Sequence, residues 1–111
     1  MHITMVKKIK HDGSPCRKCA EVEQRLQESG LLNRIDQILI ADERDPQSEG
    51  MLLAKQHQVE LAPFFIVEDE DGSVRIYTVY FRFIKEVLNS QTSAQEEAAE
   101  ILDNNPDVDF I

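Results

Sequence analysis

Two cysteines, Cys16 and Cys19, are the residues whose types and spacing most directly suggest chemistry in this chain. They lie in the stretch HDGSPCRKCAEVEQRL, and only Arg17 and Lys18 separate them. Two thiols at this spacing can cycle between dithiol and disulfide, contribute to a metal site, or do neither. Because the thiolate is the reactive form of cysteine, the surroundings that favour the anion decide what the pair can do.

The residues around Cys16 predict that it is the more acidic thiol. Cys16 follows a turn and opens an amphipathic stretch, so its sulfur should meet unpaired N–H groups and the positive end of a helix dipole. Arg17 and Lys18 add positive charge. Together these effects should lower the pKa of Cys16 below the ~8.5 of an unperturbed cysteine. Cys19 falls on the apolar face of the same stretch, so we expect it to be more buried and less acidic.

The spacing also predicts how the two thiols divide the work. Residues three positions apart on a helix are neighbours, with Cβ atoms roughly 5–6 Å apart. A small adjustment at the helix start would then permit a disulfide. The pattern favours Cys16 as the nucleophile that attacks a target disulfide and Cys19 as the thiol that resolves the mixed disulfide.

Metal binding is the main chemical alternative. His11 precedes Cys16 by a short loop and His57 lies farther along, so two cysteines and a histidine could begin a zinc site. An iron–sulfur cluster shared between two subunits could also use few ligands from each chain. The sequence has no second C-x-x-C and no closely spaced histidine pair, so we predict neither a metal nor a cofactor.

Strand and helix patterns alternate around the cysteines. In residues 3–11, apolar side chains recur at every second position, with Lys8 and Lys10 on the other face, which predicts a strand. Residues 15–29 have helical spacing and end before Gly30, a good C-terminal stop. The cysteine pair therefore lies at the start of the predicted helix, shortly after the end of the predicted strand.

The next elements repeat this alternation. The apolar run in residues 34–42 predicts a strand buried on both faces, as in a parallel sheet covered by helices. A second helix is predicted with Asp45 as its N-cap and Pro46 at its first position, continuing towards Gln58. Gly50 should weaken that helix slightly.

A hairpin and a third helix complete the predicted domain. Strands at 64–67 and 74–80 flank the Asp71-Gly72 turn, and a helix follows at 81–89. The order β-α-β-α-β-β-α predicts an α/β fold with a mixed four-stranded sheet covered by three helices. Phe64 and its neighbour in the third strand should face opposite sides of the sheet.

The composition changes after this domain. Residues 90–111 hold six acidic and no basic residues, and Ser93 with Glu96 forms a capping-box pattern ahead of a short helix ending near Asn104. We therefore divide the chain into a domain at 1–89 and an acidic helical tail at 90–111.

Charge and hydropathy exclude several classes of function. The formal charge of −9 and the pI near 4.7 argue against a nucleic-acid partner and against an anionic membrane surface. No apolar run is long enough to span a bilayer, and the start MHITMVKKIK lacks the continuous apolar segment of a signal peptide. We expect a cytoplasmic protein, where a lone cysteine pair is more often catalytic or metal-binding than structural.

Two motifs resemble the thioredoxin/glutaredoxin superfamily over residues 1–89. One is CRKC after the first strand, and the other is LAPFFIVEDEDG, in which Pro63 precedes the third strand. The chain lacks tryptophan and has Arg-Lys between the cysteines, so it looks like an atypical thioredoxin-like member. The resemblance implies a thioredoxin-like fold and a cis peptide bond before Pro63, which would face the cysteine pair.

The resemblance also implies roles for individual residues. Cys16 and Cys19 would be catalytic, and the main chain of Ala62 would pair with the substrate. The residues expected to bind substrate are Pro15, Arg17, Lys18, Ala62 and Pro63. The implied activity is a thiol-disulfide oxidoreductase that acts on a disulfide-containing protein or a small thiol and is restored by an unidentified reductant. The alternative is a non-enzymatic thioredoxin-like interaction module.

Overall fold

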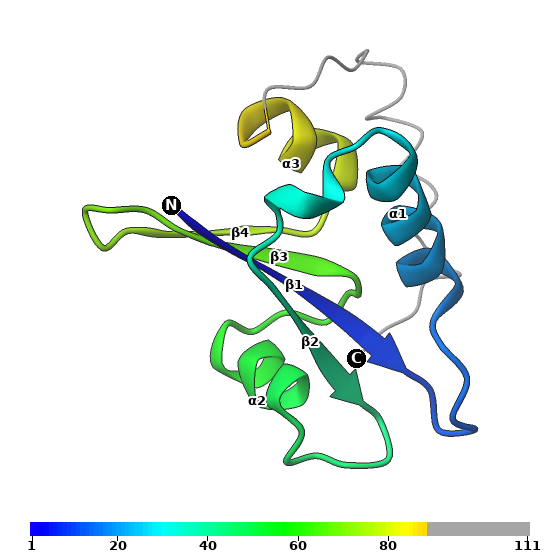
Figure 1. Ribbon diagram of the computed structural model, residues 1–111. Helices are drawn as coiled ribbons and strands as arrows, with labels where there is room; N and C mark the ends of the chain where they lie inside the picture. The colour runs from blue at the N-terminus through cyan, green and yellow to red at the C-terminus, as the bar shows by residue number, and fades with distance from the viewer. Residues whose placement is uncertain (89–111) are drawn as a thin grey trace.

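Four strands form one open mixed sheet in the computed structural model, which describes residues 1–88 (Figure 1). They are β1 (His2–Ile9), β2 (Gln37–Asp42), β3 (Phe64–Glu68) and β4 (Val74–Tyr77), in the spatial order β2-β1-β3-β4. β1 and β2 are parallel, whereas β3 is antiparallel to both β1 and β4. The predicted α/β class, element order and mixed four-stranded sheet are confirmed.

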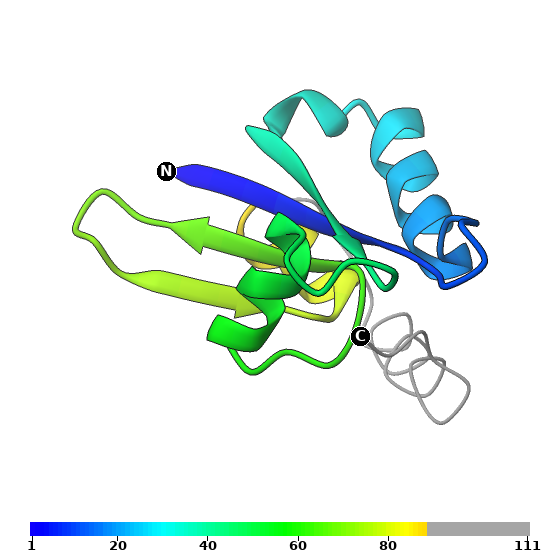
Figure 2. The same cartoon turned by 90° about the horizontal axis from the view of Figure 1, so that it is seen from below.

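Helices cover both faces of this sheet. α1 (Arg17–Glu28) and α3 (Tyr80–Glu86) lie on one face, and α2 (Glu49–Gln56) lies on the other (Figures 1 and 2). A short 3-10 helix, Leu32–Arg34, leads from α1 into β2. None of the helices in the described part of the chain is long and apolar enough to cross a membrane.

The apolar core is split into two clusters by the sheet. Phe65 belongs to the cluster under α1 and α3, where its ring stacks on Phe83 with centroids 3.9 Å apart. Phe64 belongs to the cluster under α2, together with Val6 and Ala54. Successive side chains of β3 therefore face opposite sides, as the strand periodicity predicts.

β1 is more deeply buried than its sequence pattern suggests. The alternation placed Lys8 on a polar face, yet Lys8 is 3% exposed and Thr4 is 2% exposed. The reason is that β1 is an inner strand with helices on both sides, so most of both faces is covered. Burying a lysine here requires a partner for its charge.

The prediction that the second strand is buried on both faces is wrong. β2 is an edge strand, and Ile38 and Ile40 are 37% and 36% exposed. They lie beside Met5 and Lys7 of β1, on the face that carries α1. Ala41, which points the other way, is buried under α2.

The second helix begins later than predicted. Its N-cap is Ser48 rather than Asp45, because Asp45 forms a turn of its own. The Asp45 carboxylate accepts the Gln47 N–H at 2.9 Å, and its carbonyl accepts the Ser48 hydroxyl at 2.8 Å. Gly50 then lies against β2, where a methyl group would overlap the backbone of Ile40 and Ala41.

The end of the described chain differs in detail from the prediction. β4 stops at Tyr77 instead of residue 80, and α3 begins at Tyr80 rather than residue 81. The Tyr77 hydroxyl donates to Glu86 of α3 at 3.2 Å, which joins the hairpin to the helix. The proposed domain boundary, the acidic tail at 90–111 and its short helix lie outside the described residues.

Candidate functional site

Cys16 and Cys19 lie at the start of α1, as the spacing predicts. Cys16 is the N-cap, with φ −65° and ψ 134°, and its Sγ accepts the Cys19 N–H at 3.0 Å. The two sulfur atoms are 2.6 Å apart, and both residues are free cysteines. Because a disulfide bond measures ~2.05 Å, a small movement of either side chain would close one.

The expected difference in burial between the two cysteines is absent. Cys16 is 0% exposed and Cys19 is 2% exposed, so Cys16 is not the more accessible thiol. Ala62 completes a small buried cluster with them. A helix start usually reaches solvent, but here a second segment of chain packs against it.

The end of β1 holds both cysteines through the backbone of one residue. The carbonyl of Lys8 accepts the Cys16 N–H at 3.0 Å, and the N–H of Lys8 donates to Cys19 Sγ at 3.4 Å. β3 pairs with β1 as far as Val6 and Phe64, and the same register continued would pair Lys8 with Ala62. The backbone groups of Lys8 that would otherwise pair with β3 therefore form hydrogen bonds with the cysteine pair instead.

Ala62 and Pro63 approach the pair from the loop before β3. Ala62 is 6% exposed and contacts the cysteine cluster, and Pro63 is also buried. The Ala62–Pro63 peptide bond is cis, as the resemblance implied. The two sequence motifs, distant along the chain, are thus brought together at one end of β1.

The other residues assigned to substrate binding surround the start of α1. Pro15 is exposed and forms an isolated bridge with Ile9. Arg17 has an 88% exposed side chain, which lies 3.4 Å from Glu21, and Lys18 is half-buried. Because its side chain is so exposed, Arg17 presents its charge largely to solvent. An exposed ion pair of this kind adds little stability.

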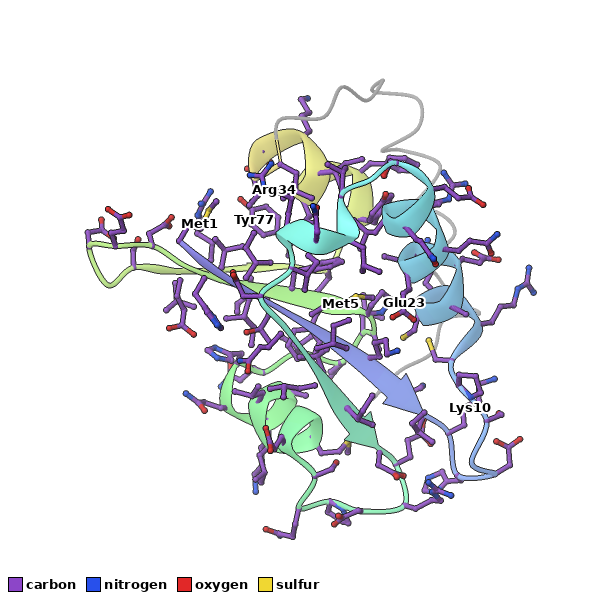
Figure 3. All side chains as sticks on the ribbon, viewed as in Figure 1. Met1, Met5, Lys10, Glu23, Arg34 and Tyr77 are labelled. Atoms are coloured by element: carbon purple, nitrogen blue, oxygen red, sulfur yellow. The ribbon has the colours of Figure 1, made fainter. Side chains whose placement is uncertain are left out.

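The loop between β1 and α1 has a well-defined turn. The Ser14 N–H and hydroxyl donate to the Asp12 carboxylate at 2.9 and 2.6 Å, and these hydrogen bonds lower the pKa of Asp12. Figure 3 shows Lys10 in this loop and Glu23 on α1. Glu23 accepts from Lys7 Nζ at 3.0 Å, which ties α1 to β1.

An ion pair at the residue whose backbone bonds both cysteines was not anticipated from the sequence. Lys8 Nζ lies 3.0 Å from Glu43 Oε1, and the second oxygen of Glu43 lies 3.1 Å from His11 Nε2. Glu43 follows β2, and the carboxyl ends of the parallel strands β1 and β2 meet at the same edge of the sheet. A lysine near the end of the first predicted strand was the available signal, but its partner is not evident from local spacing.

Asp36 and His11 lie near opposite ends of β1 and make contacts of their own. The Asp36 carboxylate accepts the Ile3 N–H at 2.6 Å, near the opposite end of β1 from the cysteines. His11 is 79% exposed in its side chain and contacts Glu43. Within residues 1–88, no group of three or more histidine, cysteine or acidic side chains is arranged to hold a metal ion.

The loop after β2 carries a second strong ion pair. Arg44 donates to the Asp42 carboxylate through Nε at 3.0 Å and through Nη2 at 2.9 Å. These side-chain hydrogen bonds, followed by the one from the Arg44 backbone, lower the pKa of Asp42 to about 2.

This end of the sheet combines two adjacent thiols, a helix N-terminus, a buried proline loop and a buried ion pair. Such an arrangement can form and break a disulfide between Cys16 and Cys19 without moving the backbone far. Comparison of the chain with known protein families, with characterised proteins and with solved structures gives no match.

Proposed function

We propose that this chain is a thiol-disulfide oxidoreductase with a thioredoxin-like fold. The observation that carries the proposal is the contact of 2.6 Å between the two sulfurs, with Cys16 Sγ capping α1. A helix N-cap favours an anion through its N–H donors and the helix dipole. The sheet order, the contact of Ala62 with the cysteine cluster and the cis bond between Ala62 and Pro63 support the thioredoxin-like assignment.

The reaction would proceed in two exchange steps. The Cys16 thiolate attacks one sulfur of a substrate disulfide, which forms a mixed disulfide and releases the other half as a thiolate. Cys19 then loses its proton to solvent and attacks Cys16 Sγ, which closes the Cys16–Cys19 disulfide and releases the second substrate thiolate. The substrate gains two electrons and the chain loses two, so a separate dithiol or two small thiols must restore it.

The surroundings of the pair suit this chemistry. Arg17 and Lys18 place positive charge at the start of α1, where it favours a thiolate. The exposed Pro15 and Arg17 would border the incoming substrate, and Ala62 and Pro63 would lie on the other side of the sulfurs. Because both sulfurs are buried, substrate entry requires the side chains over Cys16 to move. A cytoplasmic location, where thiols are kept reduced, fits this proposal.

Reduction of insulin disulfides with dithiothreitol as the electron source tests the function. The wild-type chain should accelerate insulin precipitation, and Cys16→Ser should return the rate to that of dithiothreitol alone. Ser73→Ala, in the distant β3–β4 turn, is the control and should retain wild-type activity. Equal rates for the wild type, Cys16→Ser and reductant alone would refute the oxidoreductase and favour the interaction module.

A further inference from the structure

Lys8 is a buried charge that the proposed exchange steps do not use. It is 3% exposed, and by the alternation of β1 its side chain leaves the sheet on the same face as Val6, under α2. Its ammonium lies 3.0 Å from Glu43, whose side chain is 18% exposed and also reaches His11. A charge in this position is costly unless it is paired, and Glu43 supplies the partner.

The backbone of Lys8, which carries this charge on its side chain, contacts both cysteines directly. Its N–H donates to Cys19 Sγ, and its carbonyl accepts the Cys16 N–H. The ammonium is thus one side-chain length from the atoms that bond both cysteines. In a buried region, charges are poorly screened, so their interactions are stronger than at the surface.

We propose that Lys8 is a positioning residue that tunes the cysteine pair: its buried ammonium favours the thiolate, and Glu43 offsets part of that effect. This inference rests on the proposed function and deepens it, because it names what sets the reactivity of the two thiols. A nearby positive charge favours the anionic form of a thiol, and a nearby negative charge disfavours it.

The two halves of the ion pair should therefore act with opposite signs. Lys8→Met removes the positive charge while keeping a side chain of similar length, and should raise the lower macroscopic thiol pKa. Glu43→Gln removes the negative charge with little change of shape, and should lower the same pKa. A purely structural role, in which the pair only pins β1 to the loop after β2, predicts shifts of the same sign in both variants.

The measurement is the ultraviolet absorbance of the thiolate, titrated against pH on the reduced full chain. We expect a rise of about 0.5–1 unit for Lys8→Met and a fall of similar size for Glu43→Gln. Lys55→Met is the matched control: it removes the same charge from an exposed site on α2, and should shift the pKa by less than about 0.2 units.

Other charged groups on the elements that meet here are present in all three variants, and among them His11 is in the ion-pair contact with Glu43 that Glu43→Gln alters. These groups are Lys7, Lys10, His11, Asp12, Arg17, Lys18, Glu21, Glu23, Asp42 and Arg44.

Shifts of opposite sign would support the inference, and shifts of the same sign or no shift would overturn it. Circular dichroism checks that each variant folds. If Lys8→Met does not fold, Glu43→Gln alone decides: a lowered thiol pKa supports the inference, and any other result overturns it. The titration needs no substrate. If the wild type does not reduce insulin but the two variants shift the thiol pKa in opposite directions, the proposed function is refuted and the role of Lys8 is not. If the wild type reduces insulin but both variants shift the pKa in the same direction, the role of Lys8 is refuted and the proposed function is not.

Discussion

At Cys16, two physical effects oppose one another. The Cys19 N–H and the start of α1 stabilise an anion at its sulfur, whereas complete burial disfavours any charge. In the contact between the sulfurs Cys16 Sγ is the donor to Cys19 Sγ, so this contact does not favour an anion on Cys16 over one on Cys19. Because Cys16 and not Cys19 occupies the N-cap of α1, we expect Cys16 to be the thiol that ionises first.

The assignment of roles to the two thiols can be tested by trapping. Cys19→Ser leaves Cys16 able to attack but removes the group that resolves the mixed disulfide, so a covalent adduct should accumulate. Intact mass spectrometry after exposure to a small symmetrical disulfide measures it. Cys16→Ser should give much less adduct, because Cys19 lacks the N-cap position. Equal adduct on both variants would contradict the division of roles.

At the scale of elements, the packing of α2 on β2 depends on Gly50. An added methyl would overlap the backbone of Ile40 and Ala41, and a strand backbone cannot move aside as a flexible side chain can. Gly50→Ala should therefore lower the free energy of unfolding by about 1–3 kcal/mol, as overpacking does. In an unconstrained helix the same change would raise it by roughly 0.5–1 kcal/mol.

Urea denaturation gives both the sign and the size of this effect. Gln56→Ala, on the exposed side of the same helix, is the control and should change stability by less than about 0.5 kcal/mol. If Gly50→Ala stabilised the protein, the close approach of α2 to β2 would be refuted.

Local signals predicted the order of the elements and the position of the cysteine pair, because periodicity and turn residues act over short distances. The start of α2 was missed because an aspartate such as Asp45 can cap a helix or close a turn, and in this chain it closes a turn. The exposure of Ile38 was missed because an apolar run does not reveal that its strand lies at an edge. The pairing of Lys8 with Glu43 depends on two strands meeting, so no local pattern contains it.

Over the whole molecule, net charge and turn carboxylates respond to acid in opposite ways. The chain carries −9 at neutral pH, and protonation of exposed carboxylates relieves that repulsion as the pH falls. Three aspartates in turns or at a strand end resist protonation, because hydrogen bonds lower the pKa of Asp12, Asp42 and Asp71. Stability should therefore change little in mild acid and decline only when these three groups accept protons.

Asp42 allows that decline to be measured. Its pKa of about 2 in the folded chain lies below the ~3.9 of an unfolded aspartate, so its contribution is complete above pH ~3.9 and is lost as the pH falls through about 2. Asp42→Asn cannot titrate and lacks this contribution at every pH. The stability difference between wild type and variant, from urea denaturation, should be largest near neutral pH and shrink between about pH 4 and pH 2. The relief of repulsion acts on both proteins and cancels in that difference, so a constant difference across this range would show that Arg44 does not hold Asp42 ionised.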